Sequence, residues 1–375
     1  MKLLLFGWCS LFVLLGFLAP SIFPTPGSFP YEAQLKMYEP FFLQPLAHFD
    51  GIHYLLISEN GYAQYEQAFF PLYPLLIYLL SQYLFGGHSI VAGVLISFLS
   101  FIGGMYVFKK YLQELMKKDT SIWWTLLFFL LFPTSFFLNA VYTEGLFFLL
   151  SIGTFYFIHK KNWVLAGICA FFASLTRLIG IFLIIPFALI ILRRWQEGKK
   201  LQGYFILLFA PVVGLATYCL YLWQTTGDPL YFMHVQWAFG AQRSNNLISI
   251  PQVLYRYAKI VVTSDWNIPY FISLCELFLF IGAGAILVFQ LVQLWRKKQL
   301  LSELAGLVYF SSASLILPTL TGTLSSVPRY ALLSVSIFIA LGSIKKLWIK
   351  LLIGFLFLIL HIMLFSLYVR GYFVS

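Results

Sequence analysis

Few residues of this chain can do chemistry, because only 13 of its 375 residues are acidic and only 6 are histidines. One acid, Asp50, lies in the run HFDGIHY, between Phe49 and Gly51. A carboxylate held among aromatic side chains is poorly solvated, which raises its basicity. Such a group suits a general base that takes a proton from a hydroxyl. The other interpretation, that Asp50 caps a short helix next to the membrane, stays open on the residues alone.

The same run contains two histidines. His48, Asp50 and His53 are all metal-ligand types, but their spacing matches no strong metal motif. Histidines in an aromatic-rich loop are usually hydrogen-bonded groups. We therefore expect neither a metal ion nor a cofactor, with a divalent metal as the alternative, and take His48, His53 and the adjacent Tyr54 as candidate substrate-binding residues.

Three further charges stand alone in apolar sequence: Glu144 in NAVYTEGLFF, Arg177 in SLTRLIG and Arg329 in SSVPRYALL. A charge near membrane depth is costly and commonly functional. Arginine is the side chain best matched to a phosphate, through its forked pair of donors. Snorkelling to the interface, or pairing with an acid, is the structural alternative for each arginine. We add Tyr330, which follows Arg329, to the candidate substrate contacts.

The composition predicts the setting of these residues. Hydrophobic residues make up 61% of the chain and charged residues 10%, whereas soluble domains carry about 25% charged residues. The net charge of +11 fits basic residues gathered on the cytoplasmic side of a membrane protein better than a nucleic-acid partner. The four cysteines lie in apolar runs without metal-ligand spacing. We therefore expect an all-α polytopic membrane protein.

Apolar runs of spanning length predict about eleven transmembrane helices. The segment 71–85 is shorter and begins with two prolines, which favours an interfacial or re-entrant helix. The expected spans are 3–23, 90–108, 121–139, 143–159, 162–175, 178–193, 204–223, 270–294, 303–320, 328–343 and 348–369.

Basic pairs indicate the orientation. With a retained first helix and a cytoplasmic N-terminus, every predicted inner turn carries at least two lysines or arginines. Counting 71–85 as a full span would reverse the later turns. Two outer segments, 24–89 and 224–269, are too long for simple turns, and loops of this length commonly carry function. We expect one membrane domain over 1–375, with juxtamembrane helices in the first outer segment and its working face outside the cytoplasm.

Phosphate-binding glycine loops are absent from the sequence: it contains neither GxGxxG nor GxxxxGK[ST]. This argues against an ATP-driven pump and against an enzyme that binds a nucleotide sugar at a strand–turn–helix.

Four ordered motifs resemble the PIG-V-type mannosyltransferases, which are similar to the second mannosyltransferase of GPI-anchor assembly and have prokaryotic members. The resemblance covers about 48–186 and again 326–343, roughly half of the chain, and 224–269 aligns with no motif. The motifs are HFDGIHYLLISENGY followed by AFFPLYPLL, then FPTSFFLNAVYTEGLFFLLS, ASLTRLIGIFLIIP and SVPRYALL.

The resemblance implies a membrane-embedded glycosyltransferase of the GT-C superfamily. Such enzymes move a sugar, here a hexose and most specifically mannose, from a polyprenyl-phosphate donor to a lipid or glycan acceptor on the extracytoplasmic face. They usually invert the anomeric centre. Asp50 corresponds to the family's catalytic acid and Glu144 to its second acidic position, while Arg177 and Arg329 match its LTR and PRY arginines. A phosphate-binding role for these arginines is our inference from their chemistry.

One departure from the family pattern precedes the aspartate, where many members have tryptophan and this chain has Phe49. Phenylalanine keeps the aromatic wall but lacks the indole donor. The main alternative function is a transporter or flippase of a lipid-linked sugar, which would use the arginines for passage and would need no base. A structural membrane protein is a further alternative. The expected location is the plasma membrane.

Overall fold

The computed structural model describes residues 1–27, 29–116, 118–200, 204, 206–238 and 247–374, and these ranges contain helices and no strand. The longer helices are α1 (Lys2–Ile22), α3 (Asp50–Asn60), α4 (Leu72–Leu84), α5 (Ser89–Leu115), α6 (Asp119–Leu131), α7 (Glu144–His159), α8 (Trp163–Thr176), α9 (Ile184–Gln196), α10 (Ile206–Thr226), α12 (Ile250–Thr263), α13 (Ile268–Arg296), α14 (Glu303–Thr319) and α17 (Leu347–Val369). The short ones are α2 (Glu32–Leu35), α11 (Tyr231–His234), α15 (Val327–Leu333), α16 (Ser336–Gly342) and the 3₁₀ helices η1 (Phe41–Ala47), η2 (Glu66–Ala68), η3 (Ser135–Leu138), η4 (Leu178–Leu183) and η5 (Gln236–Ala238).

Six helical stretches in the described part are long and apolar enough to cross a membrane: α1, α5, η4 with α9, α10, α13 and α17. Five shorter apolar helices, α4, α6, α7, α8 and α14, have 10–17 residues. At 1.5 Å per residue, these five fall short of a bilayer core of about 30 Å. The architecture is that of a polytopic integral membrane protein. A total of eleven transmembrane helices stays a prediction.

Two of the expected spans are interrupted. The segment 121–139 is helical only to Leu131, because Pro133 disfavours helical backbone at Phe132 and has no N–H to donate. The segment 328–343 is divided into α15 and α16 at Ser334. The hydroxyl of Ser334 donates to the carbonyl of Tyr330, a bond that bends helices, and also lies 3.0 Å from the carbonyl of Ser311 on α14.

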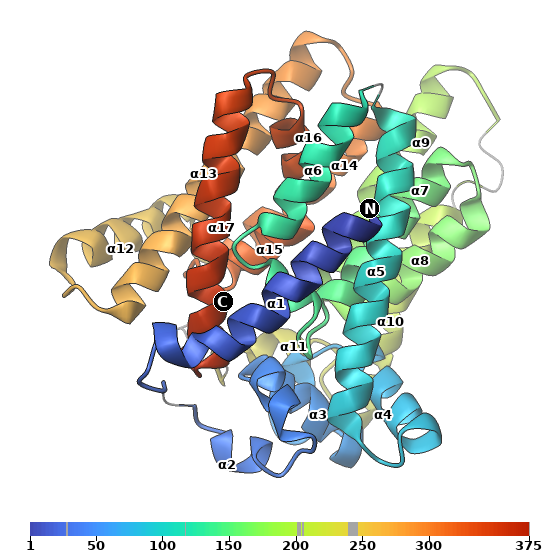
Figure 1. Cartoon of the computed structure of the whole chain (residues 1–375). Coiled ribbons are helices and arrows are strands. Elements are labelled where there is room, and N and C mark those ends of the chain that lie inside the picture. Colours follow the sequence, from blue (N-terminus) through green and yellow to red (C-terminus); the bar gives the residue numbers. More distant parts are fainter. Residues whose placement is uncertain (28, 117, 201–203, 205, 239–246, 375) are drawn as a thin grey trace.

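The first long segment, 24–89, folds into α2, η1, α3, η2 and α4, which lie together at the bottom of Figure 1. This segment is thus helical, and a juxtamembrane position for its helices stays a prediction. At the top of the same view lie the turns after α5, α9 and α13 and the start of α17. The basic pairs Lys109–Lys110, Arg193–Arg194, Arg296–Lys297 and Lys345–Lys346 lie in the last two turns of α5, in the last turn of α9, at the end of α13 and just before α17. These segments are called here the basic turns. The two ends of the molecule thus differ in charge.

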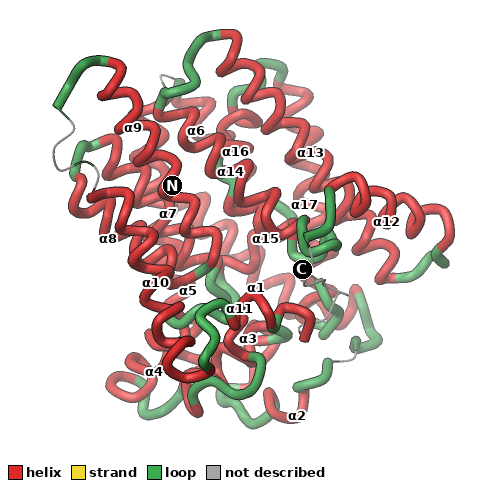
Figure 2. Tube along the Cα trace, turned by 180° about the vertical axis from the view of Figure 1, so that it is seen from behind, coloured by secondary structure: helices red, strands yellow, loops and turns green. Residues whose placement is uncertain are grey.

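Packed helices connect the two ends. Helix α5 packs against α7, α7 against α8, and α8 against α10, while α17 lies against α1 and α6. Helix α12 projects from the side of the body in both Figure 1 and Figure 2. The break between α6 and α7 and the start of α15 contact the segment 24–89, since the N–H of Val141 donates to the carbonyl of Leu46 and Arg329 donates to Asp50. Irregular backbone at this depth is tolerated where it lines a cavity.

Candidate active site

Asp50 is the first residue of α3 and follows an unusual backbone conformation. Phe49 has a φ of 55° and a ψ of −114°, a combination that residues with a side chain rarely adopt. The ring of Phe49 is held between other aromatic rings, with its centroid 4.9 Å from Phe29 and 5.2 Å from Phe373. Strained backbone of this kind clusters at active sites and persists only where its surroundings enforce it.

Gly51 allows α3 to approach the segment that leads into α7. A Cβ atom at this glycine would lie 3.3 Å from the carbonyl oxygen of Val141 and 3.5 Å from the ring of Tyr142. Tyr142 in turn donates its hydroxyl to the carbonyl of His48 at 2.9 Å. This close contact brings the start of α3, with Asp50, beside the start of α7.

Glu144 is the first residue of α7, and its side chain is completely buried. The amino end of a helix stabilises a carboxylate through the helix dipole. Oε1 of Glu144 accepts from Nη1 of Arg177 at 2.6 Å. Arg177 ends α8 in extended backbone, and its Nη1 also donates to the hydroxyl of Thr143 at 2.9 Å. The guanidinium lies 4.7 Å above the ring of Tyr330, a cation–π contact.

Arg329, in the first turn of α15, lies between the two acids. Its Nη1 donates to Oδ2 of Asp50 at 2.8 Å and lies 3.7 Å from Oε1 of Glu144. Its Nη2 donates to the hydroxyl of Ser326 at 2.9 Å. Nε of Arg329 and Oε2 of Glu144 have no hydrogen-bond partner among the described residues. Asp50, Arg329, Glu144 and Arg177 therefore form one row of alternating charges, called here the charge row.

Asp50 is the most exposed member of the charge row, and Arg177 is 11% exposed. The side chain of Asp50 is 29% exposed, that of Arg329 is 8% exposed and that of Glu144 is not exposed at all. Taking charges out of water is costly unless they are paired, so two arginines and two acids stabilise each other here. Asp50 is the member of the row that a ligand reaches first.

The charge row opens into a cavity of about 300 Å³. The site candidates Asp50, Tyr54, Arg177, Arg329 and Tyr330 line it. Its other walls come from the end of α14 and from the second long segment, which supplies Phe232, Met233, His234, Gln236 and Leu247. A largely apolar cavity with a few converging polar groups is the usual form of a small-molecule site.

The two histidines lie outside this lining. His48, which burial holds at a lowered pKa, donates from Nδ1 to the carbonyl of Tyr368 at 2.9 Å. His53 is buried and bonded to Oε1 of Glu66 at 3.0 Å. Among the described residues, no three His, Cys, Asp or Glu side chains are grouped so that they could hold a metal ion. Both histidines thus support the loop around α3 in this structure.

Sequence reasoning missed several members of the site. Thr143 and Tyr142 adjoin Glu144 in the motif NAVYTEGL, and Ser326 stands three residues before Arg329, so local spacing could have found them. Glu66 and the wall from 232–236 carry no such signal, because their positions depend on how two long segments fold together.

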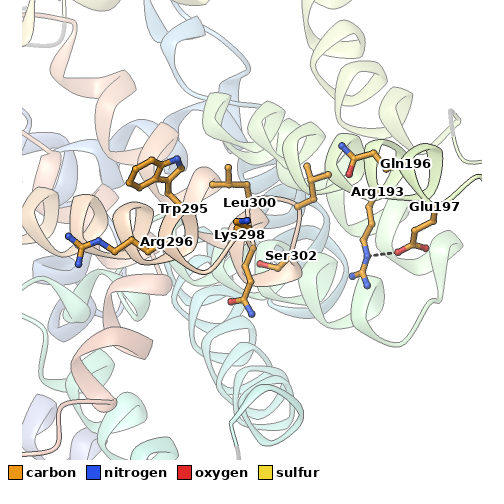
Figure 3. Close-up of a pocket in the computed structure, with 10 residues that line it drawn as sticks. Arg193, Gln196, Glu197, Trp295, Arg296, Lys298, Leu300 and Ser302 are labelled. Carbon is orange, nitrogen blue, oxygen red and sulfur yellow. Dashed lines mark hydrogen bonds and ion pairs between the residues drawn. The ribbon is translucent and has the colours of Figure 1, made fainter.

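A larger hollow of about 1060 Å³ lies at the opposite end of the molecule, between the ends of α9 and α13 (Figure 3). Arg193 and Glu197 form an ion pair of 2.9 Å on one side, and Trp295 and Arg296 lie on the other. Both arginines belong to the basic turns, which the positive-inside pattern accounts for. This hollow contains none of the candidate catalytic residues.

Comparison with known proteins gives one family. The family model described as Mannosyltransferase (PIG-V) matches residues 19–196, a range that includes Asp50, Glu144 and Arg177. No curated protein and no solved structure matches the chain.

Proposed function

Through residues 19–196 this chain belongs to the mannosyltransferase (PIG-V) family, and we propose that it transfers mannose from a polyprenyl-phosphate donor to an acceptor hydroxyl. The family makes it a membrane glycosyltransferase whose substrates are a sugar donor and an acceptor. The lipid nature of the donor, a lipid or glycan as acceptor, and inversion at the anomeric carbon are parts of our proposal. So is a reaction that needs neither cofactor nor metal ion.

The observation that carries the proposal is the charge row in the cavity. A carboxylate suited to proton removal lies within 2.8 Å of a guanidinium suited to a phosphate. A phosphate leaving group and an acceptor hydroxyl require these two functions side by side. A transporter would need only the arginines.

In the reaction that we propose, Asp50 takes the proton from the acceptor hydroxyl as its oxygen attacks the anomeric carbon. The bond between that carbon and the phosphate oxygen breaks, and the phosphate keeps the electron pair. Arg329 and Arg177 stabilise the charge that develops there, more strongly in the transition state than in the bound donor. Tyr54 and Tyr330, on the cavity wall, are proposed contacts of the sugar and its phosphate.

An apolar groove suits the prenyl chain. Gly167, Ile168, Phe171 and Phe172 of α8 and residues of α10 line a surface groove of about 330 Å³. Thr176, one helical turn beyond Phe172, lines the cavity of the charge row. One turn is about 5.4 Å, so a chain in this groove would lead its phosphate towards Arg177.

The proposed orientation follows from the charges of the two ends. The basic turns lie opposite the cavity, and such turns favour the cytoplasmic side. We therefore propose a plasma-membrane enzyme with a cytoplasmic N-terminus and an extracytoplasmic active site. The donor would enter from the outer leaflet.

Purified protein in liposomes, supplied with a synthetic polyprenyl-phosphate mannose and an extract of membrane lipids, tests this function. The expected result is loss of the donor, release of polyprenyl phosphate and a mannosylated product with the opposite anomeric configuration. A donor that crosses the bilayer unconsumed would instead identify a transporter. Retained configuration would contradict the single displacement.

A further inference from the structure

The expected base and the expected phosphate ligand are bonded to each other in this structure. Oδ2 of Asp50 accepts from Nη1 of Arg329 at 2.8 Å. An adjacent guanidinium stabilises the ionised carboxylate and so makes it a weaker base. Asp50 therefore occupies the donor atom of Arg329 that a phosphate would use, and the ion pair must open before both groups can act on a substrate.

Among the described residues, Asp50 is the more exposed of the two acids that Arg329 contacts, and both Asp50 and Arg329 line the cavity. Nε of Arg329 is buried, Nη2 is bonded to Ser326, and Nη1 points to Asp50 and Glu144. Asp50 is the most exposed member of the row and Glu144 the most buried one. An incoming anion therefore competes with the Asp50 carboxylate for the same guanidinium.

The charges of the proposed reaction favour such an exchange. Before transfer, Asp50 and the donor phosphodiester each carry one negative charge. After transfer, Asp50 holds the acceptor proton and is neutral, and the polyprenyl phosphate carries two charges. One unit of negative charge thus moves from Asp50 to the phosphate. If the guanidinium of Arg329 moves to the phosphate as well, it stabilises the products.

We propose that Arg329 is exchanged between Asp50 and the donor phosphate, so that the donor itself activates the base. This inference rests on the proposed function. In the empty enzyme Arg329 holds Asp50 as a weak base. Bound donor draws Arg329 away and raises the basicity of Asp50 while the anomeric carbon is in place. The donor must then bind before a productive acceptor.

Glu144 is the fixed counter-ion in this exchange. Its Oε1 already lies 3.7 Å from Nη1 of Arg329, and its Oε2 has no hydrogen-bond partner among the described residues. Arg177 holds the carboxylate in place at 2.6 Å. Arg329 can therefore leave Asp50 without losing its buried partner. Glu144 is a positioning residue, because it acts through the two arginines.

Binding of the product tests the exchange without any turnover. A short-chain polyprenyl phosphate that carries no sugar is titrated calorimetrically into detergent-purified protein at pH 8. Asp50→Asn, which keeps the shape of the side chain, is expected to bind it about fivefold or more tightly, because Arg329 no longer has a competing carboxylate. An unchanged or weakened affinity would overturn the exchange.

A double-mutant cycle separates exchange from simple repulsion between Asp50 and the phosphate. In an Arg329→Gln background, the gain from Asp50→Asn is expected to fall below about twofold. A gain of the same size in both backgrounds would show repulsion alone and overturn the proposal. Should Arg329→Gln not fold, as judged by thermal unfolding, Arg329→Met serves the same cycle.

The outcomes distinguish this inference from the proposed function. If wild-type protein transfers mannose but the cycle shows no coupling between Asp50 and Arg329, the proposed function is confirmed and the exchange is wrong. If no donor is consumed but the cycle shows coupling, the proposed sugar transfer is wrong. The exchange of Arg329 is then a property of an anion-binding site. If no variant binds the phosphate, the exchange is wrong.

Discussion

Arg177 and Glu144 form an ion pair of 2.6 Å between the end of α8 and the start of α7, with the carboxylate completely buried. Their partners differ, since Arg177 also bonds Thr143 and Glu144 lies near Arg329. Breaking such a pair leaves a buried charge without compensation, which costs about 3–5 kcal/mol. The pair therefore supports the stability of the fold and the geometry of the site together.

The substitution Arg177→Met is expected to lower the midpoint of thermal unfolding by several degrees, because among the described residues Glu144 then keeps the longer contact to Arg329 as its ion pair. Combining it with Glu144→Gln removes both charges and is expected to recover part of that loss. Thermal unfolding in detergent measures both variants. If the double variant lowers the unfolding midpoint by the sum of the two single-variant decreases, the two residues are not coupled and this prediction is wrong.

Gly145 is expected to tolerate no side chain. A Cβ atom there would lie 2.6 Å from the carbonyl oxygen of Ser97 and 2.7 Å from that of Leu138, and neither backbone atom can turn away. Gly145→Ala should lower the unfolding midpoint and displace Glu144. Gly284→Ala is the matched control, since a Cβ in that helix would meet nothing within 4 Å. Equal midpoints for the two variants would refute this packing.

The ring of Tyr330 is expected to orient Arg177 through its face, 4.7 Å from the guanidinium carbon. Tyr330→Phe keeps the ring and should retain kcat/KM for the donor within about twofold. Tyr330→Leu removes a contact of about 0.5–1 kcal/mol or more, and should lower kcat/KM about fivefold. If the phenylalanine variant fails as badly as the leucine variant, the hydroxyl is the important group instead.

Sugar transfer is expected to continue in the presence of EDTA, because the proposed chemistry uses arginines where a metal ion would otherwise stabilise the phosphate. The rate with and without EDTA is compared in the liposome assay. A loss of activity that Mn²⁺ or Mg²⁺ restores would show a metal requirement.

The proposed orientation predicts which side of the membrane each end faces. In a background without the native cysteines, Gln64→Cys in the segment 24–89 should react with a membrane-impermeant maleimide on intact cells. Lys298→Cys, in the turn after α13, should react only after permeabilisation. Both positions are exposed. The reverse pattern would invert the topology.

The sequence predicts where the helices of this fold lie better than it predicts how long each helix is. Each apolar run corresponds to a helix, because lipid-facing segments must satisfy their backbone bonds internally. The run 121–139 is nevertheless longer than α6, which ends at Leu131, and the run 328–343 contains two short helices, α15 and α16, in place of one. The role of Pro133 could be expected, whereas the bond from Ser334 to Ser311 depends on tertiary packing.

The sequence predicts which residue types form the candidate site, but it does not predict which of these residues contact each other. Isolated charges in apolar sequence singled out Asp50, Glu144, Arg177 and Arg329, and the structure brings all four together. Nothing local indicates that Arg329 contacts Asp50, which lies 279 residues away in the chain. The motif also makes His48 and His53 candidate substrate contacts, and the structure bonds them to Tyr368 and Glu66, outside the cavity lining.

Mannose transfer by wild type beside Asp50→Asn tests the central claim most directly, with Asp265→Asn, at an exposed position between α12 and α13, as a control that also replaces a carboxylate. Thermal unfolding first establishes that all three proteins are folded. We predict that wild type and Asp265→Asn transfer mannose from a polyprenyl-phosphate donor and that Asp50→Asn loses at least about 100-fold in kcat, the contribution of a general base. A folded Asp50→Asn variant with wild-type kcat would contradict the account.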